Sequence, residues 1–179
     1  FVDGVTTGVT ATADETTGAY TIAPTEVLSD GAYSLTVTAT DAAGNISDAS
    51  DALSITIDAT APGKPSIITT TTLTNDATPT IEGIAEAGST VTLLVDGATT
   101  GITTTADGTT GAYTITPAAL SDGAYSLTVT ATDAAGNISA SSDALSMTVD
   151  ATAPAQPAIT TTTLTSDATP TIEGTAEAD

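Results

Sequence analysis

The residues of this chain that could do chemistry are almost all carboxylates. The sequence has 22 Asp and Glu residues against one cation, Lys64, and contains no His, Cys or Arg. Imidazole bases, thiol nucleophiles and thiolate metal sites therefore lack their side chains. A formal net charge of −21 also repels nucleic acid and anionic membrane surfaces. The composition predicts a protein that is not an enzyme, with no catalytic residues, no nucleic-acid partner and no insertion into a membrane.

Carboxylates that lie close together can bind a divalent cation. Two like charges about 4 Å apart repel by roughly 1 kcal/mol even in water, so a crowded group either separates or binds a cation. Ca²⁺ accepts about 6–8 oxygen ligands at about 2.3–2.6 Å, and flexible loops suit it better than they suit Mg²⁺. Whether such a group forms depends on the elements that carry the acids.

Those elements belong to a tandem repeat. Residues 31–47 recur unchanged at 123–139, 92 positions further on (123 − 31), and we call this stretch the duplicated segment. A unit of about 92 residues is large enough to be a domain with its own core. We expect one complete repeat at 59–150. Residues 1–58 are then the C-terminal part of one repeat (strands C to G in the usual lettering), and 151–179 are the N-terminal part of the next (strands A and B).

The complete repeat has the pattern of short β-strands. Thr supplies 44 of the 179 residues, and period-2 alternation predicts seven strands, with Leu127 and Val129 on the core face of the sixth. Seven short strands in about 90 residues favour an all-β, immunoglobulin-like Greek-key sandwich with a tyrosine corner at 122–125. A Greek-key sandwich of another type is the alternative. The predicted strands lie at about 66–72, 79–86, 90–96, 99–105, 111–116, 124–132 and 140–149.

Several motifs carry a resemblance to a known family. They are the Asp-x-Thr-Ala-Pro linker at 58–62 and 150–154, Thr-Pro-Thr-Ile-x-Gly-x-Ala-Glu-x-Gly-Ser at 78–89, Leu-Ser-Asp-Gly-x-Tyr at 120–125 and Ala-Thr-Asp-Ala-Ala-Gly-Asn at 131–137. Together they resemble the bacterial Ig-like repeats of giant, type I-secreted surface adhesins of the biofilm type. The resemblance implies an extracellular stalk on a bacterial cell surface, with Ca²⁺ at the junctions between repeats.

Sandwich topology predicts where the acids meet. In a seven-stranded sandwich the N-terminus and the BC, DE and FG loops share one pole, which faces the preceding linker. The linker acid is then expected to approach acids of all three loops and, with them, to bind Ca²⁺. The predicted ligands are Asp58, Glu86, Asp107, Asp133 and Asn137, with Asp150 and Glu177 at the next junction and Asp41 on the partial first repeat.

Turn chemistry is the alternative explanation for several of these acids. Asp133 and Asn137 suit an Asx turn, with Asn in a left-handed conformation. Asp58 and Asp150 are harder to explain in this way, because each leaves a strand just before Ala-Thr-Ala-Pro, and we expect them to be ligands. The acids at the opposite pole, Asp76, Asp96 and Asp122, are expected to form turns; a second ion between Asp122 and the outgoing linker is the alternative for that residue.

The expected function is therefore mechanical. A linker with two prolines, tied by an ion to the next domain, gives a rod of about 35–40 Å per repeat that projects an adhesive tip. The alternative is a filament in which the tail of one copy completes the head of another by strand complementation. The expected partners are neighbouring repeats and, in the alternative, other copies of the chain. Carbohydrate binding has little support without Trp unless an exposed Tyr pair exists.

Overall fold

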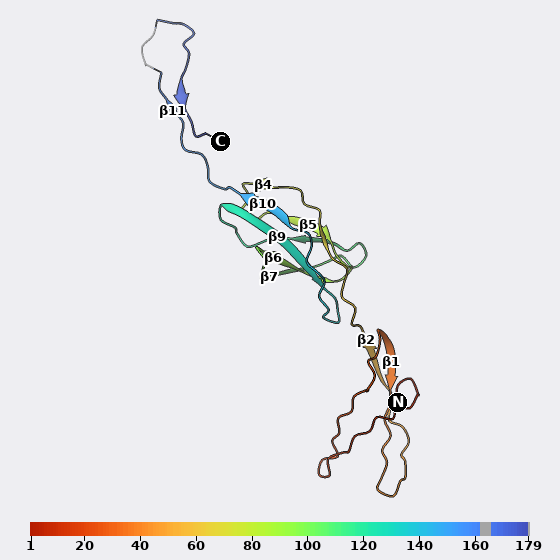
Figure 1. Ribbon diagram of the computed structural model, residues 1–179. Coiled ribbons are helices and arrows are strands. Elements are labelled where there is room, and N and C mark those ends of the chain that lie inside the picture. Colours follow the sequence, from red (N-terminus) through yellow and green to blue (C-terminus); the bar gives the residue numbers. More distant parts are fainter. Residues whose placement is uncertain (162–165, 179) are drawn as a thin grey trace. The chain divides into compact units, whose positions relative to one another are not determined.

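Every regular element in the described part of the chain is a β-strand (Figure 1). The computed structural model describes residues 1–161 and 166–178, and within them no helix is long and apolar enough to cross a membrane. The chain divides into two compact units, Phe1–Pro62 with Thr132–Ser139, and Gly63–Ala131 with Ala140–Asp179. The prediction for 151–179 includes residues 162–165 and 179, which lie outside the described residues.

The second unit contains a sandwich of two sheets. The larger sheet has the strand order β4-β10-β9-β6-β7, and the smaller has the order β3-β5-β8. Neighbouring strands are antiparallel where their register is defined, except that β4 runs parallel to β10. The strands are β3 (Ser66–Ile67), β4 (Leu73–Thr74), β5 (Ile81–Ile84), β6 (Thr90–Val95), β7 (Ala98–Thr105), β8 (Ala112–Ile115), β9 (Gly123–Thr132) and β10 (Leu145–Val149).

The core of this sandwich is small and aliphatic, as the alternating pattern predicts. Leu127, Val129 and Ala131 of β9 are fully buried, and the residues between them are half-buried. Burial of one such aliphatic side chain contributes roughly 1.5–3 kcal/mol, so the few large ones carry most of the hydrophobic stabilisation. The buried core cluster is Ile81, Val91, Leu93, Ala106, Tyr113, Ile115, Leu127, Val129 and Met147.

The first predicted strand, 66–72, is wrong as a single element. Ser66 and Ile67 pair with β5 in the smaller sheet, whereas Leu73 and Thr74 pair with β10 in the larger one. The chain crosses between the sheets through a run of Thr residues that has no alternation of apolar and polar side chains. Within the complete repeat, 59–150, eight strands therefore replace the seven expected.

The fourth predicted strand, β7, belongs to the larger sheet. It pairs with β6 through a two-residue turn in which Asp96 and Gly97 have φ values of 51° and 78°. Two consecutive positive φ values are typical of a type I′ hairpin, which requires adjacent antiparallel strands. The loop with Asp107 therefore connects the larger sheet to the smaller one.

The tyrosine corner is confirmed. The hydroxyl of Tyr125 donates to the carbonyl of Ser121 at 3.0 Å, at the start of β9. A second tyrosine, Tyr113, is buried and donates to the carbonyl of Ser66 at 2.9 Å. Its burial raises the pKa of Tyr113 to about 12.

Outside this sandwich the chain forms two isolated strand pairs. In the first unit β1 (Gly31–Leu35) pairs with β2 (Leu53–Ile57), although five strands were expected in 1–58. In the second unit β11 (Ala158–Ile159) pairs with β12 (Gly174–Thr175). Neither pair has a second sheet packed on it in the described residues, and most of their side chains are exposed.

Candidate junction site

The acidic loop after β9 is an Asx turn. The Oδ1 atom of Asp133 accepts the backbone N–H of Asn137 at 2.9 Å, and its Oδ2 atom accepts the Asn137 side-chain amide at 2.8 Å. These bonds, the side-chain bond first, lower the pKa of Asp133 from its ordinary 3.8. The expectation that Asn137 takes the left-handed conformation is wrong, because Gly136 has the positive φ, at 95°. Asp41 and Asn45 form the same turn, which also lowers the pKa of Asp41.

The same loop contacts the linker acid. The side-chain amide of Asn137 donates to the backbone carbonyl of Asp58 at 3.0 Å, and both residues belong to the first unit. The carboxylate of Asp58 accepts the N–H of Thr60 at 3.2 Å, so this acid does have a local turn contact. Asp58, Asp133 and Asn137 are thus connected, through the Asp58 carbonyl and the Asn137 amide.

The acids of the other two loops belong to the second unit. Asp107 accepts two backbone N–H groups, from Thr109 at 3.0 Å and Thr110 at 2.7 Å, together with the Thr110 hydroxyl, and these bonds lower its pKa. The carbonyl of Glu86 accepts the hydroxyl of Ser89 at 2.7 Å. The loops of Glu86 and Asp107 lie side by side, because backbone bonds join Gly88 and Ser89 to Ala106.

The acids predicted for the next junction also contact their linker. Asp150 accepts the N–H of Thr152 at 3.3 Å, the same contact that Asp58 makes with Thr60. The Oε2 atom of Glu177 accepts the N–H of Ala155 at 2.6 Å, just beyond the linker motif. Glu177 therefore lies against the chain that leaves the complete repeat.

Two acids hold the outgoing linkers, and one of them, Asp122, is a residue that turn chemistry was expected to explain. Asp122 accepts the N–H of Ala151 at 2.8 Å and the hydroxyl of Thr152. Asp30 accepts the N–H of Ala59 at 2.8 Å and the hydroxyl of Thr60. We call each set of contacts a linker clamp. In both, the Thr hydroxyl is the largest cause of a lowered Asp pKa, followed by the Ala N–H. Asp122 therefore contacts the outgoing linker directly, and a second ion at this residue stays a prediction.

The donors at the junction suit a hard cation in their chemistry. Carboxylates and backbone carbonyls are the oxygen ligands that Ca²⁺ takes. Within the described residues, 1–161 and 166–178, no three acids form a preassembled cluster. Asp58, Asp133 and Asn137 belong to one unit and Glu86 and Asp107 to the other, and the predicted ligand set that spans both units stays a prediction.

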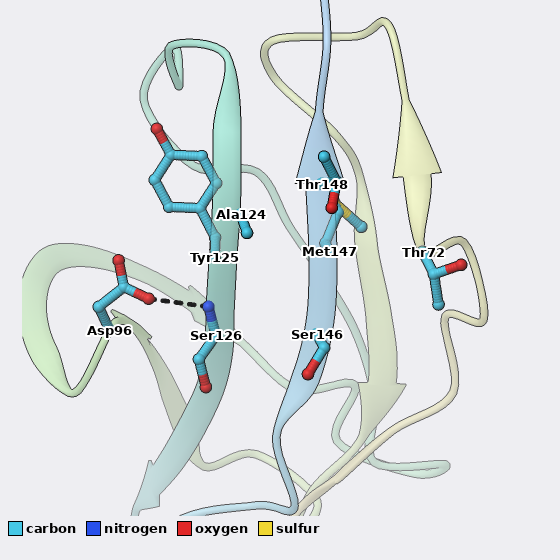
Figure 2. A pocket seen from close by; sticks show the side chains of 8 residues that line it. All are labelled: Thr72, Asp96, Ala124, Tyr125, Ser126, Ser146, Met147 and Thr148. Carbon is cyan, nitrogen blue, oxygen red and sulfur yellow. Dashed lines mark hydrogen bonds between the residues drawn. The ribbon is translucent and has the colours of Figure 1, made fainter. Parts of the chain in front are cut away.

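An open groove lies beside the tyrosine corner (Figure 2). It measures about 600 Å³ and lies over β9 and β10, with Tyr125 as its one aromatic lining residue. Asp96 reaches into it from the β6–β7 turn and accepts the N–H of Ser126 at 2.8 Å. Because Tyr125 is the single tyrosine that lines it, the groove does not supply the exposed tyrosine pair that carbohydrate binding would need.

The duplicated segment and the linkers define a chain of tandem repeats, in which residues 66–149 form a β-sandwich. Residues 2–59 and 66–151 match the family described as "Bacterial Ig-like domain". The chain belongs to this family, and its sandwich is immunoglobulin-like.

Several known proteins are similar to parts of the chain. Exoglucanase B of Cellulomonas fimi is 36% identical over 162 residues, which cover 84% of this chain but only 15% of that enzyme. Fibronectin(III)-like modules of Clostridium thermocellum CbhA align with a TM-score of 0.47 at 18% identity, covering 76% of this chain and 70% of theirs. The BSP domain of a biofilm-associated protein aligns with a TM-score of 0.40 at 24% identity, covering 80% of this chain and 23% of its own.

Proposed function

We propose that this chain is a stretch of stalk repeats from a bacterial cell-surface adhesin, and that Ca²⁺ at the junctions between repeats limits their bending. Membership of the bacterial Ig-like family and the tandem duplication support a spacer role. The observation that carries the proposal is the duplicated linker, which is hydrogen-bonded through Asp30 in one copy and Asp122 in the other. The repeats themselves are not catalytic in this role.

The linker is already restricted by its own contacts. The clamp at Asp30 holds Ala59 and Thr60, and Pro62 and Pro65 are buried with their φ angles fixed by the ring. Lys64 adds an ion pair with Asp143 at 2.7 Å, which is exposed and therefore contributes at most about 1 kcal/mol. Gly63, between the two prolines, keeps its torsional freedom, so a further restraint at Asp58 is expected to reduce bending.

Calcium would supply that restraint. The residues that would hold the ion are Asp58 and Asp133, with Glu86, Asp107 and Asn137 as the other proposed ligands. Bound there, Ca²⁺ supplies positive charge and oxygen coordination. Without a cation, the acids of a chain with net charge −21 repel one another, and the junction is expected to open. Asp150 and Glu177 are the proposed Ca²⁺ ligands at the following junction. Asp41 is the proposed ligand on the partial first repeat.

Small-angle scattering tests this proposal. We expect the maximum dimension of the chain to be larger in millimolar Ca²⁺ than in EDTA at equal ionic strength, with Mg²⁺ giving a smaller change. The variant Asp133→Asn should lose the response, whereas Asp51→Asn, which removes an exposed charge outside the proposed set, should keep it. Equal dimensions in Ca²⁺ and EDTA for the unmodified chain, at a concentration where it is monomeric, would contradict the calcium mechanism.

The similarity to Exoglucanase B favours a second candidate, spacer repeats within a secreted enzyme. The chain spans 15% of that relative, so the catalytic activity of the relative does not transfer to it. The two candidates share the spacer role and differ in what the repeats separate. The coding sequence on either side of this segment distinguishes them, because an adhesin continues with further repeats and a secreted enzyme with a catalytic domain.

A further inference from the structure

The two ends of the complete repeat meet in a parallel strand pair. Strand β4 follows the incoming linker (58–62), β10 leads directly into the outgoing one, and the two strands run parallel. The N–H of Thr148 donates to the carbonyl of Thr72 at 2.7 Å. The N–H of Asp150 donates to the carbonyl of Thr74 at 2.9 Å. Because the strands are parallel, the start of β4 and the end of β10 lie at opposite ends of the pair.

This arrangement decides how tension acts on the pair. A pull on the two linkers draws β4 toward its own start and β10 toward its own end, so the strands are forced to slide past each other. The hydrogen bonds run from strand to strand, across the direction of sliding, and are therefore loaded together. In an antiparallel pair of terminal strands the two pulled ends would be neighbours, and the bonds would break one after another. The pair of β4 and β10 therefore has to break as a unit.

The incoming chain is also fastened to the smaller sheet. Ser66 and Ile67 form β3 and pair with β5, and the N–H of Ile68 donates to the carbonyl of Glu82 at 2.8 Å. The buried Tyr113 adds its hydroxyl bond to the Ser66 carbonyl at 2.9 Å. A pull from the incoming linker therefore meets β3 before it reaches β4.

The outgoing chain is fastened by the linker clamp at Asp122. This residue comes directly before β9, which pairs antiparallel with β10. Its carboxylate accepts the N–H of Ala151 and the hydroxyl of Thr152, both beyond the last residue of β10. The side chain thereby extends the pairing of β9 with β10 into the linker. A pull from the outgoing linker meets this clamp first.

We propose that the linker clamp at Asp122 is a mechanical element of the repeat. Together with β3 and the pair of β4 and β10, it makes tension along the linkers shear the terminal strands, which slows unfolding under force. This role rests on the proposed stalk function, because a stalk that holds an adhesive tip has to transmit tension. The hydrogen bonds that provide it all lie within the second unit, and none of them needs a bound ion.

Single-molecule stretching of the 179-residue chain in EDTA, with handles at its two ends, tests the clamp. Unfolding of the sandwich at constant force is recognised by the length released, about 3.3–3.6 Å for each residue. Thr152→Val keeps the shape of the side chain and removes the hydroxyl. It should shorten the folded lifetime about 10-fold, because a hydrogen bond to a charged group is lost. Asp122→Ala removes both contacts and should shorten the lifetime further.

Thr78→Val is the matched control. The hydroxyl of Thr78 also donates to a carboxylate, that of Asp76 at 3.0 Å. Both residues follow β4 and lie outside the segments that join the handles to the terminal strands. The lost bond therefore carries no tension, and the lifetime under force should stay close to that of the unmodified chain.

A change of pulling points tests the shear itself. The chain has no Cys, so Asn75→Cys supplies a specific handle just beyond the end of β4. Tension between this handle and the C-terminus separates β4 from β10 at neighbouring ends, and single bonds then break in turn. The folded lifetime at the same force should be at least about 10-fold shorter than with handles at both ends of the chain.

Three outcomes would overturn the proposal. They are equal lifetimes in the two pulling geometries, an unchanged lifetime for Thr152→Val, and an equal loss for Thr78→Val. Such a failure would leave the proposed stalk function standing, because the scattering response to Ca²⁺ tests that function by itself.

Discussion

The two copies of the duplicated segment have the same sequence and different structures. Residues 123–132 form the ten-residue strand β9, whereas the same residues at 31–40 form only the five-residue strand β1. Leu127, Val129 and Ala131 are fully buried, but Leu35 and Val37 are half-buried and Ala39 is exposed. In the second unit a second sheet packs on β9, and in the first unit the described residues provide none. The long strand therefore depends on tertiary packing.

Local contacts, in contrast, are the same in both copies. Tyr33 and Tyr125 each bond to a carbonyl four residues upstream. The Asx turns and the linker clamps are also repeated, with nearly equal distances. Bonds between residues that are close in sequence, or joined by one strand pair, form without the core. The comparison separates what the repeat sequence specifies by itself from what needs a complete sandwich.

Matched leucine truncations should give the largest difference between the copies. Leu127→Ala leaves a cavity in a fully buried site and is expected to lower the free energy of unfolding of the complete repeat by about 2–5 kcal/mol. Leu35→Ala changes the same residue in the same sequence and should leave that free energy unchanged within about 0.5 kcal/mol. Urea unfolding of both variants, at concentrations where the chain is monomeric, measures the effects. Equal losses would mean that the copies are packed alike.

Matched glycine substitutions should give the next largest difference. Gly111 and Gly18 are counterparts with φ values of 71° and 70°, so Ala is strained at both by about 1–2 kcal/mol. At Gly111 the added Cβ atom would also lie 2.1 Å from the carbonyl oxygen of Ala85, whereas at Gly18 nothing lies within 4 Å. Gly111→Ala should therefore destabilise the complete repeat by about 2–4 kcal/mol in total.

The control is Gly18→Ala, which should leave the unfolding of the complete repeat unchanged. A loss of less than about 1 kcal/mol for Gly111→Ala would show that β5 and the loop before β8 can move apart. In that case the two copies would differ less than their packing indicates.

The sequence predicted the parts of the fold that follow from periodicity. Alternation located β9 and its buried face, and the Ser-Asp-Gly-x-Tyr motif located the corner at Tyr125. The alternation of apolar and polar residues did not locate β4. This strand has only two residues, which pair in parallel with β10, and two residues are too few to show a period. The strand β7 and the Asp96-Gly97 turn before it were predicted as well, because Asp-Gly is typical of a tight hairpin.

The contacts of the candidate site that follow from a sequence motif or from the topology were also predictable, whereas the linker clamp was not. The turn at Asp133 and the approach of Asn137 to Asp58 follow from motif and topology. The clamp at Asp122 was missed, because a turn already explained the residue and its partner Thr152 lies 30 residues away (152 − 122). A long-range hydrogen bond between two polar side chains has no sequence period. Only the recurrence of the same pair at Asp30 and Thr60 could have indicated it.

Acid titration of the linker clamps should give the smallest effect and, in contrast to the core, the same one in both copies. Their lowered pKa values mean that the ionised, bonded form of Asp30 and Asp122 is favoured in the folded chain above the ordinary pKa of 3.8. That stabilisation is lost as the pH falls through the lowered pKa. The amide resonances of Ala59 and Ala151, which donate to these carboxylates, should therefore shift together below pH 3.8 in an NMR titration.

Asp122→Asn provides the internal control for this titration. It should remove the pH dependence at Ala151 and leave the Ala59 curve unchanged, because each clamp lies within its own unit. If the two amides of the unmodified chain instead titrate at clearly different pH values, the clamps sense the packing around them. The division between local contacts and a context-dependent core would then fail at the linker.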